Sequence, residues 1–234
     1  MNRKPFKFKQ FSIFQDKTAM KVGTDGVLLG AWADCLGKDI LDIGTGTGLI
    51  SMMLAQRFPQ SQIDAIEIDE NAYYQAKENF ENAPFQNRLS IYFTSLQAYK
   101  TDKKYDLIVS NPPFFTVNDL NEFDARKQAR QEETLTFSDL LKKTALLLNK
   151  DGLASFIIPH DRMLEFCAIA AENALKVSKT TQIKGNETSP IKRVLLEFSF
   201  EEKERKENLL TIEVERHRYT EDYINLTKDF YLKM

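Results

Sequence analysis

The chain has 234 residues, of which 42% are hydrophobic, so it is long enough to enclose one large core or two small ones. Thirty-two basic and 34 acidic residues leave a net charge of −2, which excludes a globally basic nucleic-acid binder and leaves local patches for that role. Two cysteines and two histidines exclude a disulfide framework and a zinc site of ordinary spacing, so no metal is expected. No stretch approaches 18 apolar residues and the basic N-terminus lacks an apolar signal region, so we expect a reduced cytoplasmic protein without membrane contact.

Residues 1–22 form a basic and aromatic extension in which cations alternate with rings. The cations are Arg3, Lys4, Lys7, Lys9, Lys17 and Lys21, and the rings are Phe6, Phe8, Phe11 and Phe14. Such a pattern can grip phosphates and stack on bases. We favour the alternative, an edge strand whose rings pack inward while the lysines face water, although both can hold at once.

The segment Lys21-Val-Gly-Thr-Asp-Gly26 introduces an apolar run over 27–33 that predicts a helix. Thr24 or Asp25 can cap this helix, and the glycines permit a close approach. The functional alternative places Thr24 and Asp25 beside a bound cofactor. The local sequence leaves both interpretations open.

A glycine-rich turn, Gly44-Thr-Gly-Thr-Gly48, joins a predicted strand over 39–43 to a predicted helix over 49–57. Glycines let the backbone pass close to a ligand, and the helix start offers free amides. A dinucleotide-binding GxGxxG turn would need glycine at 49, where the chain has Leu49. The GxGxG form opened by Asp42 is instead the one used for S-adenosylmethionine.

The next predicted strand, 62–67, ends in Glu67, about 20 residues beyond the turn, where an acid binds a ribose diol in such folds. We favour ribose binding over a merely solvated strand end. Asp69 then caps a predicted helix that runs to about residue 82, and residues 89–93 predict a third strand.

Asn111-Pro-Pro-Phe114 follows a fourth buried strand, 105–110, at the carboxyl edge where ligands bind in open α/β sheets. The prolines keep neighbouring carbonyls out of a helix and free to face a ligand. The Asn111 side-chain oxygen and the Pro112 carbonyl can then accept the two protons of an exocyclic amine, while Phe114 stacks on the attached ring. The alternative is a proline turn with a core phenylalanine.

A polar segment without periodicity, 115–133, follows this motif and contains Arg126, Lys127 and Arg130. Loops of this length in compact domains are commonly functional or disordered. Because the segment starts at the candidate site, we favour a substrate-binding lid over a solvated insert.

The remainder of the chain predicts further helices and strands within one domain that spans 1–234. Helices are expected over 137–149 and 161–175, strands over 153–158, 177–183, 194–200 and 209–215, partly antiparallel, and a final amphipathic helix over 219–234 that docks through Tyr223, Leu226 and Phe230. Residues 176–193 hold five cations and one acid, which is usually a solvated face but would be a second phosphate contact near an RNA site.

This alternation of strands and helices resembles the class I S-adenosylmethionine-dependent methyltransferase fold. The resemblance implies an α/β, Rossmann-like architecture: a mostly parallel seven-stranded sheet flanked by helices, with an antiparallel C-terminal strand pair. The residues from Asp42 to Gly48 resemble the first motif of that fold, Glu67 its ribose-binding acid, and the Asn111 segment its amino-methylating motif.

Four further segments extend the resemblance to nearly the whole chain. They are Lys21 to Trp32, Gln128-Ala-Arg130, Arg193-Val-Leu-Leu196 and Phe230-Tyr-Leu-Lys-Met234. Together they resemble the bacterial tRNA1(Val) adenine-37 N6-methyltransferase family. The resemblance implies a monomer that transfers a methyl group from S-adenosylmethionine to the N6 amine of an adenosine in the anticodon stem-loop of a tRNA.

The site residues expected on this basis fall into three groups. The catalytic residues are Asn111, Pro112 and Phe114; the cofactor residues are Thr24, Asp25, Asp42, Gly44, Gly46, Gly48, Glu67, Ser95 and Asn111; the RNA contacts are Lys21, Arg126, Lys127, Arg130 and Arg193. Ser95 departs from the family, which usually places an acid there against the adenine amine of the cofactor. A serine hydroxyl can accept the same hydrogen bond, but without a charge.

Three other functions stay open from the sequence. A guanine-N2 methyltransferase acting on ribosomal RNA shares the motif type, and a glutamine methyltransferase acting on a translation factor usually has tyrosine where this chain has Phe114. A non-catalytic RNA-binding module is disfavoured because Asp42, Glu67 and Asn111 are all intact.

Overall fold

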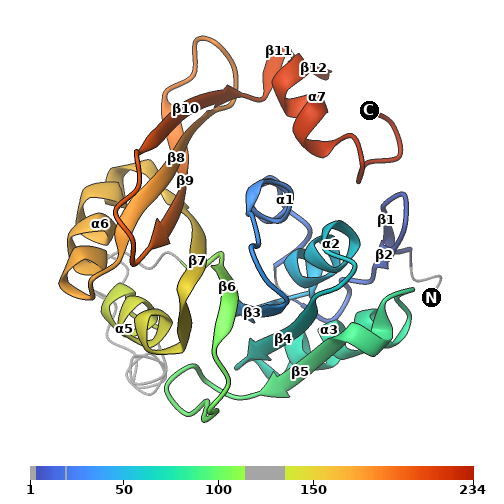
Figure 1. Ribbon diagram of the computed structural model, residues 1–234. Helices are drawn as coiled ribbons and strands as arrows, with labels where there is room; N and C mark the ends of the chain where they lie inside the picture. Colours follow the sequence, from blue (N-terminus) through green and yellow to red (C-terminus); the bar gives the residue numbers. More distant parts are fainter. Residues whose placement is uncertain (1–3, 19, 114–134) are drawn as a thin grey trace, which may run out of the picture.

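The computed structural model describes residues 4–18, 20–113 and 135–234, and its central feature is an eight-stranded sheet (Figure 1). The strands lie in the order β10-β8-β9-β7-β6-β3-β4-β5. Their bounds are β3 Asp39–Ile43, β4 Gln62–Glu67, β5 Leu89–Phe93, β6 Tyr105–Ser110, β7 Leu148–Pro159, β8 Lys176–Lys184, β9 Ile191–Ser199 and β10 Lys206–Thr211. Within this sheet β9 runs antiparallel to both of its neighbours, and all other neighbouring strands are parallel. The predicted α/β class with a mostly parallel sheet is therefore confirmed.

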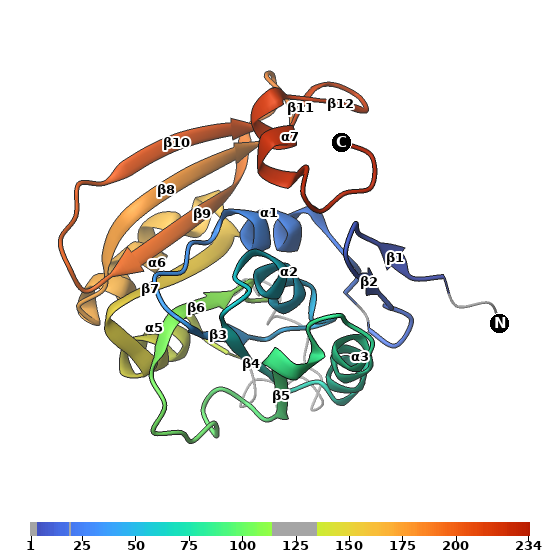
Figure 2. The ribbon, with the colours of Figure 1, turned by 45° about the vertical axis from the view of Figure 1, so that its right-hand side comes forward.

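Helices cover both faces of the sheet (Figures 1 and 2). Their bounds are α1 Thr24–Trp32, α2 Leu49–Arg57, α3 Glu70–Glu81, α5 Phe137–Leu147, α6 Met163–Glu172 and α7 Glu221–Thr227, with short 3₁₀ turns η1 Gln86–Arg88 and η3 His160–Arg162. Helices α1, α2, α3 and α7 lie on one face, and α5 and α6 lie on the other. The two faces enclose separate apolar clusters because buried side chains of the sheet alternate between them, as Ile157 and Ile158 of β7 do.

The sheet has eight strands, one more than the resemblance implies, because the strand expected near residue 209 joins the sheet as β10, parallel to β8. The predicted strand over 209–215 is also divided: β10 ends at Thr211, and β11 (Glu213–Glu215) pairs antiparallel with β12 (Arg218–Tyr219). The division occurs where Ile212 and Glu213 donate backbone hydrogen bonds to the carbonyls of Lys184 and Gly185. This pairing with a distant strand end leaves no trace in local periodicity.

The final helix is shorter than the predicted 219–234, since α7 ends at Thr227. Beyond it residues 228–230 form a turn, and the chain then pairs with the N-terminal segment: the Lys9 N–H donates to the Phe230 carbonyl at 2.8 Å, and Phe8 bridges to Tyr231. Tyr223 and Phe230 are buried as expected. After the turn, the carbonyls of Lys228 and Phe230 accept hydrogen bonds from Lys9 of the N-terminal segment and not from a further helical turn.

The N-terminal segment forms a small antiparallel pair, β1 (Phe6–Lys7) with β2 (Ser12–Ile13), apart from the central sheet. The rings of Phe8 and Phe11 are buried and stack at 4.7 Å, while Lys7 and Lys9 are exposed. The packing interpretation is thus confirmed for these two rings, although the strand is not an edge of the sheet.

Helix α1 begins differently from the prediction. Its N-cap is Gly23, and no side chain caps its first turn, so neither Thr24 nor Asp25 has the predicted capping role. By contrast, Asp69 caps α3 as expected, because its carboxylate accepts from the Ala72 N–H at 2.8 Å.

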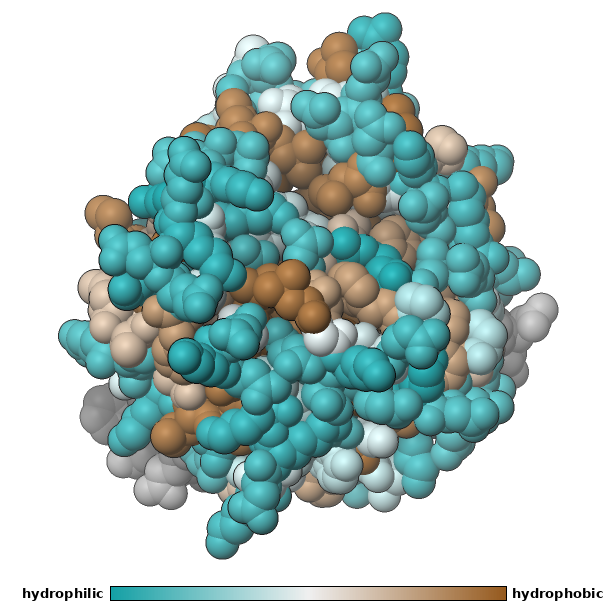
Figure 3. Space-filling model, in the orientation of Figure 1, coloured by the Kyte–Doolittle hydropathy of each residue, from teal (hydrophilic) through white to brown (hydrophobic). Residues whose placement is uncertain are grey.

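Figure 3 shows the surface in the orientation of Figure 1 as mainly hydrophilic, with apolar residues in separated patches. Within residues 4–18, 20–113 and 135–234, no helix is both long and apolar enough to cross a membrane. The same described ranges contain no group of three or more histidine, cysteine, aspartate or glutamate side chains that could hold a metal ion.

Candidate active site

Three glycines shape the turn between β3 and α2. Gly44, Gly46 and Gly48 have φ angles of 70°, 60° and 82°, a left-handed conformation that L side chains rarely adopt. A Cβ atom at Gly44 or Gly46 would have no atom within 4 Å, whereas one at Gly48 would lie 2.4 Å from Cε1 of Phe80. Gly48 therefore permits packing against α3, and Gly44 and Gly46 leave their backbone open to a ligand.

Glu67 is fixed beside this turn by backbone donors. Its Oε2 accepts from the Gly46 N–H at 2.8 Å, and its Oε1 accepts from the N–H groups of Ile68 and Asp69, each at 2.9 Å. The side chain is only 7% exposed. Three fixed hydrogen bonds thus orient the carboxylate at the carboxyl end of β4, where the sequence predicted a ribose-binding acid.

Asp42 is fully buried beneath the turn and is only half satisfied. Its Oδ2 accepts from the hydroxyls of Thr45 at 2.6 Å and Ser51 at 2.7 Å, and from the Ser51 N–H at 3.2 Å. Its Oδ1 is buried and has no hydrogen-bond partner among the described residues. Burial raises the pKa of Asp42 to about 6, against the hydrogen bonds from Thr45 and Ser51 and with the charge of Glu67 adding to the rise. An additional donor would relieve this unpaired oxygen.

The Asn111 motif lies level with the glycine turn. Ser110, the last residue of β6, pairs with Ile43, the last residue of β3, and its hydroxyl donates to the Ile43 carbonyl at 2.8 Å. The residues that follow, Asn111 and Gly44, therefore leave neighbouring strands at the same edge of the sheet. Asn111 is partly buried, and the last member of the predicted catalytic set, Phe114, lies outside the described residues.

The first turn of helix α1 packs against Leu49, the residue that follows the glycine turn. A Cβ at Gly26 would lie 3.1 Å from Cδ2 of Leu49, the first residue of α2. Thr24 is exposed, and the Asp25 carboxylate accepts from Nε of Arg193 at 2.7 Å. The structure thus brings Asp25, a predicted cofactor residue, together with Arg193, a predicted RNA contact.

Ser95 lies just beyond β5, the edge strand next to β4. Phe93 pairs with Glu67, and the Thr94 N–H donates to the Glu67 carbonyl at 3.0 Å, so Ser95 is two residues past the level of Glu67. Its hydroxyl accepts from the Ala98 N–H at 3.2 Å, which caps the turn that follows. The hydroxyl proton and a second lone pair remain for a ligand.

Of the predicted RNA contacts, the structure describes Lys21 and Arg193. Lys21 donates from Nζ to the carbonyls of Gln15 and Thr18, at 2.5 and 2.9 Å, and so holds the N-terminal segment in shape. Arg126, Lys127 and Arg130 lie outside the described residues. Within 176–193, Lys176 at the start of β8 pairs with Glu202, far along the strand from Lys184 at its end.

Sequence reasoning missed the side chains that support Asp42 and the glycine turn. Thr45 and Ser51 hold the Asp42 carboxylate, and Asn79 of α3 donates to the carbonyls of Thr47 and Phe14, at 2.8 and 2.9 Å. The sequence signal for Ser51 was a polar residue within an apolar helical run. The signal for Asn79 was its place at helical spacing from Ala72 and Ala76, on the face of α3 that is buried.

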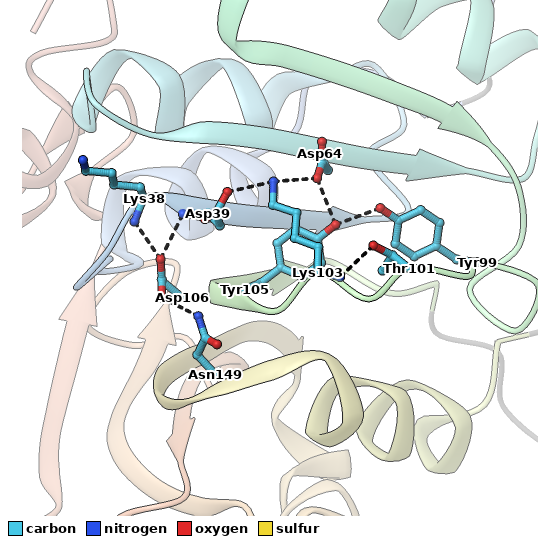
Figure 4. Close-up of polar contacts among 9 residues, drawn as sticks. All are labelled: Lys38, Asp39, Asp64, Tyr99, Thr101, Lys103, Tyr105, Asp106 and Asn149. Carbon is cyan, nitrogen blue, oxygen red and sulfur yellow. Dashed lines mark hydrogen bonds and ion pairs between the residues drawn. The ribbon is translucent and has the colours of Figure 1, made fainter.

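A second polar cluster lies at the opposite, amino edge of the same strands (Figure 4). Lys103 contacts Asp39 at 2.8 Å and Asp64 at 2.9 Å, and the Tyr105 hydroxyl donates to Asp64 at 2.9 Å. Nearby, Asp106 accepts from backbone N–H groups at the start of β3 and from Asn149. These contacts tie together the beginnings of β3, β4 and β6, and the network is remote from the carboxyl edge.

Solved structures share this architecture. A predicted O-methyltransferase of Agrobacterium tumefaciens superposes with a TM-score of 0.69 over 88% of this chain and 96% of its own, at 17% identity. The ribosomal protein L11 methylase of Lactobacillus delbrueckii gives a TM-score of 0.55 over 79% of this chain and 82% of its own, at 20% identity. At such identities the likeness shows the fold alone, and this fold is that of the class I methyltransferases.

Sequence relatives are far closer. The methyltransferase small domain family matches residues 16–160. A tRNA1(Val) (adenine(37)-N6)-methyltransferase of Flavobacterium psychrophilum is 50% identical over 98% of this chain and 100% of its own, and one of Christiangramia forsetii is 47% identical over the full length of both. The chain, with its glycine turn, fixed acid and Asn111 motif at one sheet edge, belongs to the tRNA1(Val) (adenine(37)-N6)-methyltransferase family.

Proposed function

We propose that the chain transfers a methyl group from S-adenosylmethionine to the N6 amine of adenosine 37 in tRNA1(Val). The relatives that carry this name match the chain from end to end. The observation that carries the proposal is the bond between the Ser110 hydroxyl and the Ile43 carbonyl, since it brings Asn111 level with the glycine turn. An amine-orienting amide and a cofactor-binding turn then share one edge.

The residues present fit S-adenosylmethionine. Gly44 and Gly46 have open space where a side chain would stand, and Asp42 has a buried oxygen to which no described residue donates. When bound, the cofactor supplies a methyl group on a positively charged sulfonium. In the proposal Glu67 accepts hydrogen bonds from the ribose hydroxyls, Gly48 ends the turn, and Ser95 accepts from the adenine amine.

The proposed mechanism depends on orienting the amine. An adenine N6 is a poor nucleophile because its lone pair is delocalised into the ring. The Asn111 side-chain oxygen and the Pro112 carbonyl accept hydrogen bonds from its two N–H groups, which favours a pyramidal nitrogen with a directed lone pair, and Phe114 stacks on the base. The N–C bond forms as the C–S bond breaks, and the methylated nitrogen then releases one proton to solvent. The protein then acts by positioning and electrostatics in a direct displacement, without a covalent enzyme intermediate.

The proposal extends to the RNA contacts. Segment 115–133 would act as a substrate lid in which Arg126, Lys127 and Arg130 contact tRNA phosphates, and Lys21 would be a further phosphate contact. The chain would act as one domain and as a monomer, and its tRNA substrate would be met in the cytoplasm.

A substrate comparison tests the function. Purified protein and radiolabelled S-adenosylmethionine are incubated separately with bulk tRNA, ribosomal RNA and a release factor, and each product is digested to nucleosides or amino acids. We expect N6-methyladenosine in the tRNA sample alone. Label in ribosomal guanosine or in protein would contradict the proposed substrate while leaving the methyltransferase assignment in place.

The same assay tests the central residue. Asn111→Ala should keep S-adenosylmethionine affinity and lower turnover by about 10²-fold or more, as expected for the loss of a transition-state hydrogen bond. Asn173→Ala, at the end of α6, removes an amide that donates to the Ile169 carbonyl and serves as the control. Near-normal turnover of Asn111→Ala would remove Asn111 from the mechanism.

A further inference from the structure

Arg193 stands on β9 at the carboxyl edge of the sheet, on the face that carries α1. It pairs across the sheet with Pro159, the last residue of β7, and Leu195, two residues along the strand, packs in the cluster that contains Leu28 and Trp32 of α1. Side chains two residues apart on a strand share a face. The guanidinium is therefore directed toward α1, and its Nε donates to the Asp25 carboxylate at 2.7 Å.

The ion pair acts on a helix end that has no other side-chain cap. The N-cap of α1 is Gly23, with no capping hydrogen bond, while residues 26–32 are all buried. At the opposite end, Arg57 donates to the carbonyls of Gly30 and Ala33. The pair with Arg193 thus holds the first turn of α1, as Arg57 holds the last. Solvent screens this ion pair only partly, because the side chains of Arg193 and Asp25 are 35% and 28% exposed.

The anchored turn is in contact with the cofactor half of the site. Gly26, next to Asp25, packs so closely on Leu49 that a Cβ there would lie 3.1 Å from Cδ2 of that side chain. Leu49 directly follows the glycine turn and opens α2. A chain of contacts therefore runs from β9 through the first turn of α1 to the backbone that borders Gly44 and Gly46.

We propose that Arg193 is a positioning residue: through Asp25 it holds the first turn of α1 against α2 and keeps the glycine turn in its cofactor-binding shape. This inference rests on the proposed use of S-adenosylmethionine and differs from the sequence-based expectation that Arg193 contacts RNA phosphates. The two roles make different demands. A positioning residue affects cofactor affinity without tRNA, and a phosphate contact affects tRNA affinity and its salt dependence.

The test is a double-mutant cycle on S-adenosylmethionine binding, measured by calorimetry without RNA. Arg193→Gln and Asp25→Asn should each raise the dissociation constant by about fivefold, the upper range for a partly exposed pair. The double variant should be no worse than Arg193→Gln, because Arg193→Gln already removes the contact with Asp25, together with the hydrogen bond from Nη1 to the Lys192 carbonyl. Arg193→Lys should recover part of the affinity.

Lys192→Gln is the matched control, since it removes the same charge from the neighbouring, exposed position on β9. It should leave the dissociation constant unchanged, and Arg193→Gln should leave the salt dependence of tRNA binding unchanged. The inference is overturned if Arg193→Gln binds S-adenosylmethionine with normal affinity. A decrease of about 1 in the salt slope of tRNA binding would then identify Arg193 as a phosphate contact. A wild-type chain that fails to bind S-adenosylmethionine would contradict the proposed function itself. If Arg193→Gln does not fold, Asp25→Asn and Arg193→Lys decide the question.

Discussion

Asp42 is the residue at which the free energy of unfolding and the proposed cofactor binding make opposite demands. Its carboxylate is fully buried with one oxygen that has no hydrogen-bond partner among the described residues, and burial raises its pKa to about 6. Because this value exceeds that of an unfolded aspartate, the native state holds the proton more tightly, and the stability that Asp42 contributes is greatest below about pH 4 and is lost as the pH rises to about 6. At neutral pH the buried charge destabilises the fold by on the order of 3 kcal/mol.

We therefore expect Asp42→Asn to change stability in a pH-dependent way. Asparagine keeps an oxygen for Thr45 and Ser51 but has no charge to bury, so the stability of the variant relative to the wild type should increase from pH 4 to pH 6 and then level off. Urea unfolding at pH 4, 5, 6 and 7 measures this difference. Asp102→Asn, at an exposed position, is the control. A difference that stays constant with pH would contradict the assigned cause.

At the scale of elements, we expect Gly48 of the glycine turn to affect mainly stability and Gly46 to affect mainly the proposed cofactor binding. Gly46→Ala meets open space and adds only the strain of a left-handed residue, about 1–2 kcal/mol, whereas Gly48→Ala adds overlap with Phe80 of about 1–3 kcal/mol more. Thermal unfolding should therefore rank Gly48→Ala as the less stable variant. Cofactor affinity, measured where both variants are folded, should be weakened by Gly46→Ala, whose methyl group would occupy the open space that we propose for the cofactor. The reverse ranking in stability would show that the packing on α3 is not what requires Gly48.

Elements in the first half of the chain could be predicted from sequence because their signals are local. The predicted strands 39–43, 62–67, 89–93 and 105–110 have the bounds of β3, β4, β5 and β6, since each is a short run bordered by glycine, charge or polar turns. The C-terminal elements depend on distant partners. Residues 212–213 form hydrogen bonds with the end of β8, and Phe230 forms one with the N-terminal segment. Local periodicity contains neither contact, so the predicted strand over 209–215 and the predicted helix over 219–234 had the wrong bounds.

The candidate site divides in the same way. The glycine turn could be predicted from the close spacing of its glycines, and Glu67 from its position at the end of the next strand, about 20 residues beyond the turn. The pair of Asp25 and Arg193 joins residues 168 positions apart, and each was assigned another role from its own neighbourhood. A contact of that kind depends on sheet order, which places β9 beside β7, and no local pattern contains it.

At the scale of the whole molecule, the carboxyl and amino edges of the central sheet differ in how well their polar groups are paired. The carboxyl edge holds left-handed glycines and a carboxylate oxygen that lacks a hydrogen-bond partner within the described parts of the chain, features that lower stability and suit the proposed cofactor site. The amino edge holds a network whose side chains satisfy one another (Figure 4). Burial acts to lower the pKa of Lys103, but its hydrogen bonds to Asp39 and Asp64 outweigh burial and raise that pKa, so the ammonium supports the fold throughout neutral pH.

Lys103→Met should consequently lower stability and leave function intact. The change leaves Asp64, which is 8% exposed, with only the Tyr105 hydroxyl as a hydrogen-bond partner in the network of Figure 4, and we expect a loss of about 1–3 kcal/mol in the free energy of unfolding. Denaturant unfolding measures this loss, with Lys100→Met at an exposed position as the control. The dissociation constant for S-adenosylmethionine should change by less than about twofold, because perturbations at distant, independent sites act separately. A large loss of cofactor affinity in Lys103→Met, at unchanged stability, would mean that the amino edge communicates with the site through the strands.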